Sequence, residues 1–196
     1  MKNFLRLILF LIIFSFYVFP GFAKDIQKIL MIIASQNFRD EELLIPKKLF
    51  EKEGYEVVIA STSLKPSKGM LGAVVTPQIL IDKVKIGDYS AIVFVGGVGA
   101  QEYFNHPIAH KIAREAVSQG KVLAAICIAP RILAEAGVLK GKKATVWVSE
   151  GKVLEEKGAY YTGRSVEIDG KIITASGPQA AEEFAKSIIK LLKTKK

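Results

Sequence analysis

Cysteine and histidine are nearly missing from this chain, which has one cysteine and two histidines among its 196 residues. A single cysteine cannot form an intramolecular disulfide, so Cys127 is buried, reactive or paired with another molecule. His106 and His110 have the i, i+4 spacing that can share a metal, but no third histidine or second cysteine completes a site. We therefore expect no metal site, and we assign both histidines to surface or capping roles.

The chain also lacks a Walker sequence, internal repeats and low-complexity tracts. Its glycine-rich stretch at residues 96–99, "GGVG", does not have the spacing of a dinucleotide-binding fingerprint. The net charge is +9, but the C-terminal lysines are not interleaved with aromatic residues as in nucleic-acid-binding segments. We expect no organic cofactor and no nucleic-acid partner, and we interpret these lysines as a solvated helix face.

The N-terminal segment differs in composition from the rest. Lys2 and Arg6 precede an apolar run that Pro20 breaks, and small residues follow at the positions that a signal peptidase reads. The run is shorter than the ~20 residues that span a bilayer. We predict a cleaved signal peptide over residues 1–23 and an exported domain over residues 24–196, periplasmic or extracellular, without stable membrane contact. An uncleaved N-terminal membrane anchor is the alternative.

The rest of the chain alternates short apolar runs with segments of helical periodicity. This pattern predicts a three-layer, doubly wound α/β domain with a mostly parallel sheet. The expected strands are residues 28–34, 55–61, 91–95, 121–127 and 143–147, a hairpin around Asp169-Gly170, and less regular β structure over 65–82. The expected helices lie near residues 43–53, 106–118, 129–136, 153–157 and 178–192, the last opened by Gly177-Pro178. Trp147 is expected in the core.

Three polar or turn-forming segments follow strands of this sheet, at residues 35–42, 96–101 and at Cys127. Sheets of this type bind ligands outside the carboxyl ends of their strands, so we expect the three segments to converge on one site. Cys127 ends an apolar strand and Pro130 starts a helix almost at once. Such a sharp turn presents a side chain as a nucleophile, and the helix start favours the thiolate.

The acidic cluster Asp40, Glu41 and Glu42 is open to two interpretations. All three side chains suit the first turn of a helix. Pro46 has no N–H for the carbonyl of Glu42, and a carboxyl kept protonated by burial can donate to a thiolate or relay a proton. The amides of Gly96 or Gly97, together with that of Ile128, could form an oxyanion hole.

Four motifs in this order resemble the ThiJ/PfpI superfamily, which includes a Parkinson-disease-associated deglycase and archaeal intracellular proteases. They are "EELLIP" (41–46), "VFVGGVGAQ" (93–101), "AAICIAP" (124–130) and "DGKIITASGP" (169–178). The resemblance implies a flavodoxin-like fold, shared with class I glutamine amidotransferases. It implies that Cys127 is the nucleophilic or redox-active cysteine, that Glu42 hydrogen-bonds it, and that Gly97 and Ile128 are backbone donors. It also implies a homodimer or higher homo-oligomer.

One departure from the family pattern bears on the reaction. The protease-like members have a histidine directly after the cysteine, where this chain has Ile128, and Trp147 stands near the place from which other relatives supply one. Because a cysteine protease needs an imidazole to protonate the leaving amine, proteolysis is disfavoured. We expect a cysteine-dependent deglycase or glyoxalase acting on dicarbonyls such as methylglyoxal or on their early protein adducts. A redox-responsive chaperone or sensor using Cys127 is the alternative, and an inert binding member of the family is a third.

Overall fold

A seven-stranded sheet forms the centre of the protein in the computed structural model, which describes residues 26–194. The predicted signal peptide and anchor at residues 1–23 lie outside this range. The strands are β1 (Lys28–Ile32), β3 (Glu56–Ser61), β6 (Ile79–Leu80), β7 (Ala91–Phe94), β8 (Val122–Ile126), β11 (Val166–Asp169) and β12 (Ile172–Ala175). Their order is β11-β12-β8-β7-β1-β3-β6, and only β11 is antiparallel to its neighbour. The predicted mostly parallel sheet is confirmed.

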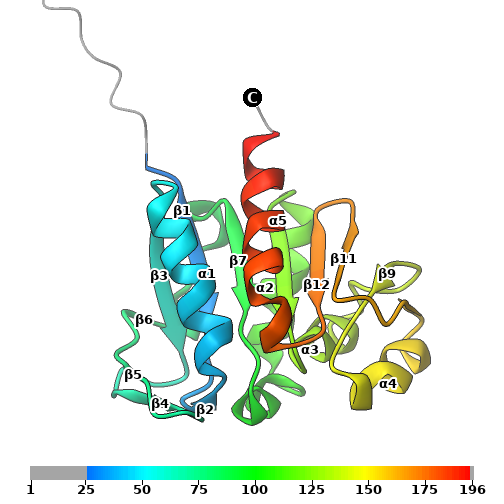
Figure 1. The fold of residues 1–196 in the computed structure, drawn as a ribbon, viewed down its shortest axis with the longest axis horizontal. Coiled ribbons are helices and arrows are strands. Elements are labelled where there is room, and N and C mark those ends of the chain that lie inside the picture. Colours follow the sequence, from blue (N-terminus) through cyan, green and yellow to red (C-terminus); the bar gives the residue numbers. More distant parts are fainter. Residues whose placement is uncertain (1–25, 195–196) are drawn as a thin grey trace, which may run out of the picture.

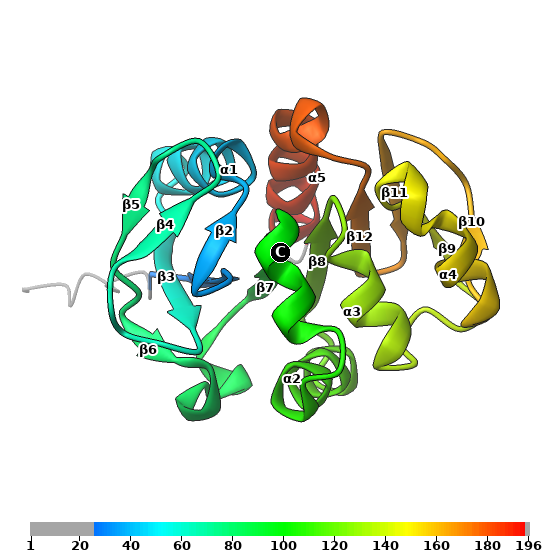
Figure 2. The same cartoon turned by 90° about the horizontal axis from the view of Figure 1, so that it is seen from below.

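Helices cover both faces of this sheet. They are α1 (Asp40–Lys52), α2 (Pro107–Ser118), α3 (Pro130–Glu135), α4 (Gly151–Glu156) and α5 (Ala181–Lys193). Helices α1 and α5 lie side by side on one face, and α2 and α3 lie on the other (Figures 1 and 2). The predicted three-layer, doubly wound arrangement is therefore confirmed.

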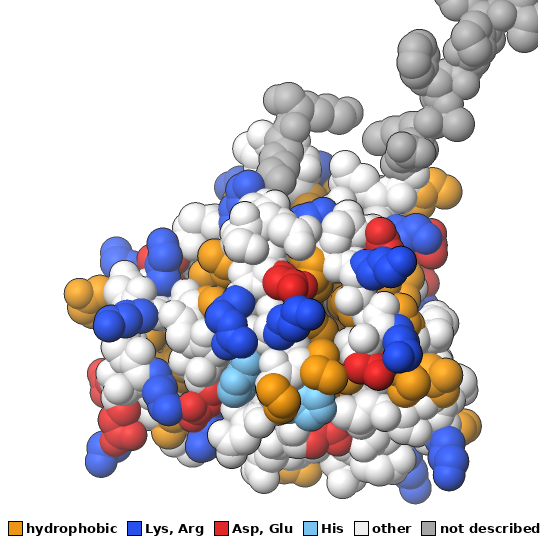
Figure 3. All heavy atoms as spheres, turned by 180° about the vertical axis from the view of Figure 1, so that it is seen from behind, with side chains coloured by type: hydrophobic (Ala, Val, Ile, Leu, Met, Phe, Trp, Pro, Cys, Tyr) orange, Lys and Arg blue, Asp and Glu red, His pale blue; other side chains and the backbone are white. Residues whose placement is uncertain are grey.

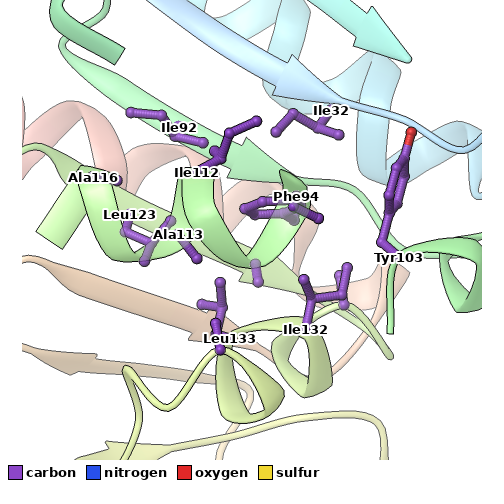
Figure 4. Close-up of a cluster of buried hydrophobic side chains, with 14 of the residues drawn as sticks. Ile32, Ile92, Phe94, Tyr103, Ile112, Ala113, Ala116, Leu123, Ile132 and Leu133 are labelled. Atoms are coloured by element: carbon purple, nitrogen blue, oxygen red, sulfur yellow. The ribbon is translucent and has the colours of Figure 1, made fainter. Parts of the chain in front are cut away.

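The two central strands β7 and β8 are buried along their whole length. Their sequences, "AIVF" and "VLAAI", are uninterrupted apolar runs because helices cover both of their faces. Figure 4 shows the layer between the sheet and α2 and α3, where Phe94, Leu123 and Ile132 point toward one another. The strand ends that carry the candidate site are thus held by a closely packed core.

Two small sheets lie outside the main one. Strands β2 (Gln36–Phe38), β4 (Ser67–Gly69) and β5 (Val74–Val75) form one, and β9 (Lys143–Ala144) and β10 (Tyr160–Tyr161) form the other. The β structure predicted for residues 65–82 is confirmed as β4, β5 and β6. The polar, turn-forming segment predicted at residues 35–42 is wrong in part, because its residues Gln36–Phe38 form β2, a strand that pairs with the distant β4.

Helix boundaries differ from prediction at three places, the first being α1, which begins at Asp40, three residues before the expected start. The last helix was expected to open at Pro178, but residues 178–180 form a 3-10 turn and α5 begins at Ala181. Helix α4 begins at Gly151, two residues before the expected start, and continues a 3-10 turn. The predicted hairpin is confirmed: Gly170, with φ 63°, forms the turn between β11 and β12.

Both histidines lie on the face that α2 covers, where basic and acidic side chains alternate (Figure 3). His106 caps α2 by accepting from the Ala109 N–H at 3.4 Å, and His110 Nε2 donates to the Phe104 carbonyl at 2.7 Å. The capping role predicted for His106 is confirmed. Among residues 26–194, none of the helices is both long and apolar enough to cross a bilayer.

Candidate active site

Cys127 lies at the turn between β8 and α3 in a backbone conformation that is rare for a side chain other than glycine. Its φ is 62°, in the left-handed region, which costs on the order of 1 kcal/mol. Hydrogen bonds hold this conformation on both sides: the Cys127 N–H donates to Ala175 at 2.9 Å, and its carbonyl accepts from Trp147 at 2.8 Å. The predicted sharp turn is confirmed, and the neighbouring strands keep it in place.

The glycine pair after β7 packs tightly against the segment before α1. The Arg39 N–H donates to the Gly96 carbonyl at 3.0 Å. Gly97 has φ 94°, and a Cβ there would overlap the Arg39 nitrogen and lie 2.5 Å from the Asn37 carbonyl oxygen. Only glycine fits this close approach, and the approach brings the start of α1 against the end of β7.

Glu42 reaches the thiol through this contact. Its side chain is fully buried, and Oε2 accepts from the Gly96 N–H at 3.1 Å. A Cβ on Gly96 would lie 2.5 Å from that oxygen and 2.6 Å from the Cys127 Cβ. The carboxyl and the thiol lie close enough for each to shift the pKa of the other. The three segments that were predicted to converge therefore do so at Cys127.

Burial makes Glu42 a weak acid. Loss of hydration raises the pKa of Glu42 to about 8, although the nearby Cys127 thiol, the hydrogen bond from Gly96 and the charge of Arg39 act in the opposite direction. At neutral pH the carboxyl therefore carries a proton most of the time. This is the protonated carboxyl that the sequence suggested for this position.

The thiol differs from expectation. The pKa of Cys127 is raised to about 12, first by burial and then by the charge of an ionised Glu42, while the N–H groups of Gly97 and Ile128 lower it. The N–H group of Ile128, at the start of the helix, lowers the pKa as predicted, but burial has the larger effect and the net shift is upward.

The thiol and the carboxyl titrate as a pair. When Glu42 is protonated, it does not repel a negative sulfur, and its O–H can donate to that sulfur. The neutral carboxyl therefore favours the Cys127 thiolate, whereas the ionised carboxylate disfavours it. The first proton leaves the pair as the pH rises through about 8, the pKa of the carboxyl. The pair then holds a single proton. When that proton is on the Glu42 carboxyl, the Cys127 sulfur is a thiolate and can act as the nucleophile.

Backbone donors surround the same sulfur. The N–H groups of Gly97 and Ile128, both predicted as donors, lie near enough to the thiol to lower the pKa of Cys127. They come from the ends of two different strands, β7 and β8, which the parallel sheet places next to each other. Donors held in this way can stabilise negative charge on the sulfur or on an oxygen beside it.

A pocket of about 250 Å³ opens above the thiol. Its lining residues come from six separate segments of the chain: Arg39, Met70, Gly97, Val98, Cys127, Ile128, Trp147 and Pro178. Trp147 is 41% exposed, so the prediction that it belongs to the core is wrong. It is a wall of the pocket because its backbone bonds to Cys127 and its ring packs close to Gly177.

Asp40 has a role that its position in a helix start did not suggest. It is 5% exposed, and its carboxylate accepts from the Leu71 N–H at 2.8 Å and from the Ala73 N–H at 2.7 Å. These bonds hold the turn between β4 and β5, which places Met70 at the pocket. Asp40 carried no sequence signal for this function, because its partners lie about thirty residues away.

No histidine lies at this site within residues 26–194. Neither His106 nor His110 lines the pocket that contains the thiol, and both form hydrogen bonds at helix α2. The chemistry available around Cys127 is therefore that of a thiol, a protonated carboxyl and two N–H donors. A proton shuttle here would have to be Glu42.

Comparison with known proteins places these features in one family. A family model described as the DJ-1/PfpI family matches residues 27–191. Over 168 residues the chain is 42% identical to Uncharacterized protein MJ0967 of Methanocaldococcus jannaschii, covering 84% of this chain and 82% of the relative. Over 167 residues it is 33% identical to Deglycase PfpI of Pyrococcus furiosus, covering 85% of this chain and all of the relative.

One further relative and one solved structure are similar to the chain over most of its length. A glutathione-independent glyoxalase of Caenorhabditis elegans, DJR-1.2, is 26% identical over 163 residues, which are 83% of this chain and 87% of the relative. The solved structure of a ThiJ/PfpI domain protein from Brachyspira murdochii superposes with a TM-score of 0.85 at 28% identity, covering 87% of this chain and 99% of that one. The match spans nearly all the described residues, including the segments that form the site.

Proposed function

Because the chain belongs to the DJ-1/PfpI family, we propose that it is a cysteine-dependent enzyme of the deglycase or glyoxalase type. Its substrates would be reactive dicarbonyls, with methylglyoxal as a simple example, or their early adducts with protein amines and thiols. The observation that carries the proposal is the arrangement at the pocket floor: the Cys127 thiol lies beside the N–H groups of Gly97 and Ile128 and beside the fully buried carboxyl of Glu42.

The proposed first step is addition of the thiol to the aldehyde carbon. A bond forms between Sγ and that carbon, the π pair of the carbonyl moves to its oxygen, and the thiol proton ends on that oxygen. Gly97 and Ile128 would donate to the oxygen while it is negative, and Glu42 would carry the proton. A shuttle with a pKa of about 8 suits this role, because it can both hold and release a proton near neutral pH.

Turnover of methylglyoxal by matched variants tests the proposal. We expect Cys127→Ser to lose at least about a thousandfold in rate and Glu42→Gln on the order of a hundredfold, since each removes a group that acts on the reacting atoms. Glu51→Gln is the control, because it makes the same change on the same helix at a carboxylate that is 47% exposed, pairs with Lys47 and does not line the pocket. Equal consumption of methylglyoxal by the wild type and Cys127→Ser would refute the proposal.

A redox sensor is the second candidate, and the same donors favour it. Two equivalents of peroxide would convert the thiol to a sulfinic acid, which Gly97, Ile128 and protonated Glu42 could hydrogen-bond. One solved relative of similar fold is titled Toxoplasma gondii DJ-1, oxidized, at 27% identity and a TM-score of 0.77. A stable gain of two oxygens at Cys127, without turnover of dicarbonyls, would favour this function over the first.

We also propose that residues 1–23 direct the protein out of the cytoplasm and are then removed. The composition of that segment supports this proposal, with two basic residues before an apolar run. Amino-terminal sequencing of the protein recovered from its native cells would show a chain starting at Lys24. A chain that retains Met1 and sediments with membranes would instead support the anchor.

A further inference from the structure

The pocket above Cys127 has a single charged residue in its wall. Arg39 lines it, and the other lining residues are apolar or neutral. An acidic group in this space borders one basic residue, whose side chain is partly exposed, among apolar side chains such as Met70 and Trp147. Electrostatic attraction is stronger there than in bulk water, because the walls exclude solvent.

The Arg39 guanidinium is held from one edge. Nη2 donates to Glu41 Oε1 at 3.1 Å, and Nε lies 2.9 Å from Oε2 of the same carboxylate as an ion pair, without the alignment of a hydrogen bond. Within residues 26–194 no acceptor pairs with Nη1, so the opposite edge retains donors for a ligand. The main chain is fixed as well, because the Arg39 N–H donates to the Gly96 carbonyl.

Glu41 does not cancel this charge for a ligand in the pocket. Glu41 is not among the residues that line the pocket, whereas Arg39 is. A bound anion therefore borders Arg39 and does not border Glu41. Glu42, the other carboxyl near the thiol, is mostly neutral at pH 7 and adds little repulsion.

We propose that Arg39 determines substrate specificity by binding an acidic group, a carboxylate or a phosphate, on the molecule whose carbonyl Cys127 attacks. This inference rests on the proposed function and narrows it. The substrate class becomes small reactive carbonyl compounds with an anionic group, and neutral methylglyoxal becomes a weaker surrogate. The pocket of about 250 Å³ is small for a ligand site, so the carbonyl and the acidic group must lie close together.

The first test uses two alkylating reagents that differ in charge, iodoacetate and iodoacetamide. Both modify the single cysteine, so the mass of the intact protein reports each rate. Dividing each rate by that of the same chain unfolded in urea removes the difference in intrinsic reactivity. We expect the folded protein to prefer iodoacetate, and Arg39→Gln to lower that preference on the order of tenfold.

Two further variants separate charge from packing. Arg39→Lys keeps the charge but not the planar guanidinium, so we expect it to retain part of the preference. Arg114→Gln is the matched control, because it removes the charge of an exposed arginine on α2. We expect this control to leave the ratio of the two rates unchanged.

The second test uses protection of the thiol. Glyoxylate carries a carboxylate next to its aldehyde, and methylglyoxal is neutral. We expect glyoxylate to protect the wild type from iodoacetamide at lower concentration than methylglyoxal does, and Arg39→Gln to reverse this order. An unchanged order in the variant would contradict the proposal.

The proposal would also be overturned if Arg39→Gln slowed alkylation by both reagents equally, so that the ratio of the two rates did not change. Such a result would mean that Arg39 only orders the chain beside Gly96. Failure of the proposed function would look different, because Cys127 would then react with iodoacetamide no faster than in the unfolded chain. The ratio of the two alkylation rates at alkaline pH would still decide the role of Arg39, since even an unactivated thiol is alkylated at that pH.

Discussion

The layer beneath α2 and α3 and the carboxyl edge of the sheet lie on the same strands but are built in opposite ways. In the layer, side chains such as Leu123 and Ile132 are fully buried and apolar (Figure 4). At the edge, Cys127 has a left-handed backbone and Glu42 is fully buried with a raised pKa. The layer stabilises the fold, and the edge uses part of that stability to hold groups in unfavourable but reactive states.

The largest expected effect on stability comes from the layer. Leu123 lies near the start of β8, at the other end of the strand from Cys127, and is fully buried. Leu123→Ala removes its contacts and leaves a cavity, so we expect it to lower the free energy of unfolding by about 2–5 kcal/mol. Urea denaturation measures this change.

The same variant tests whether the two regions are separable. We expect the turnover per folded molecule of Leu123→Ala to match that of the wild type. Leu64→Ala is the control, since Leu64 is 48% exposed and its removal should change stability by less than about 0.5 kcal/mol. A large loss of turnover in fully folded Leu123→Ala would show that the layer and the edge are not independent.

The next largest effect is the pH dependence of stability that Glu42, a residue of the carboxyl edge, contributes. Its pKa is about 8 in the folded protein against 4.5 for the free side chain, so the folded state binds the proton more tightly. The stability contributed by protonated Glu42 is complete below pH 4.5 and is lost as the pH rises through about 8. Between pH 4.5 and pH 7 we expect the wild type to lose about 3 kcal/mol from this group.

Glu42→Gln removes this dependence. We expect its melting temperature to fall less than that of the wild type between pH 5 and pH 8, while its thiol is alkylated at higher pH. Glu41→Gln should retain the wild-type slope, because Glu41 is partly exposed and paired with Arg39. A parallel decline in Glu42→Gln and the wild type would mean that Glu42 is ionised in the folded protein.

The smallest effect concerns the support of the pocket at Asp40. Asp40→Asn keeps one oxygen for the Ala73 N–H but turns an NH2 group toward a second N–H, that of Leu71. We expect a loss of about 1–2 kcal/mol in stability and a higher KM with a nearly unchanged kcat, since only the turn that carries Met70 is loosened. Denaturation and steady-state kinetics measure the two effects.

Asp82→Asn is the matched control for this change, because the Asp82 side chain is 44% exposed and pairs only with its neighbour Lys83. We expect it to change neither stability nor KM. A lowered kcat in Asp40→Asn, with an unchanged KM, would contradict a role confined to the pocket wall.

Much of the fold was predictable because its signals are local. Apolar runs such as "AIVFV" and "KVLAAIC" indicate buried strands by themselves, and Asp169-Gly170 indicates a hairpin. Strand β2 was not predictable, because it exists only through pairing with β4, about thirty residues away. Its residue Asn37, with φ 58°, follows no local preference that would mark a strand.

The site, like the fold, has residues that could be predicted from local sequence and residues that could not. Cys127 stood out because it is the one cysteine at a strand end, and Glu42 stood out because a helix proline follows it. Arg39, Met70 and Trp147 did not stand out, since ordinary charged and apolar residues reveal a pocket only when distant segments meet. The pKa of the thiol was also misjudged, because burial cannot be read from a motif.

The amino-acid sequence by itself determined the order of strands and helices, the sharp turn at Cys127 and the family to which the chain is similar. These depend on periodicity, glycine and proline, which act within a few residues. Only the tertiary structure decided that Glu42 holds its proton, that Asp40 supports a turn and that Arg39 lines the pocket over the thiol. Desolvation and charge depend on distance in space, and the fold brings together groups that the chain keeps far apart.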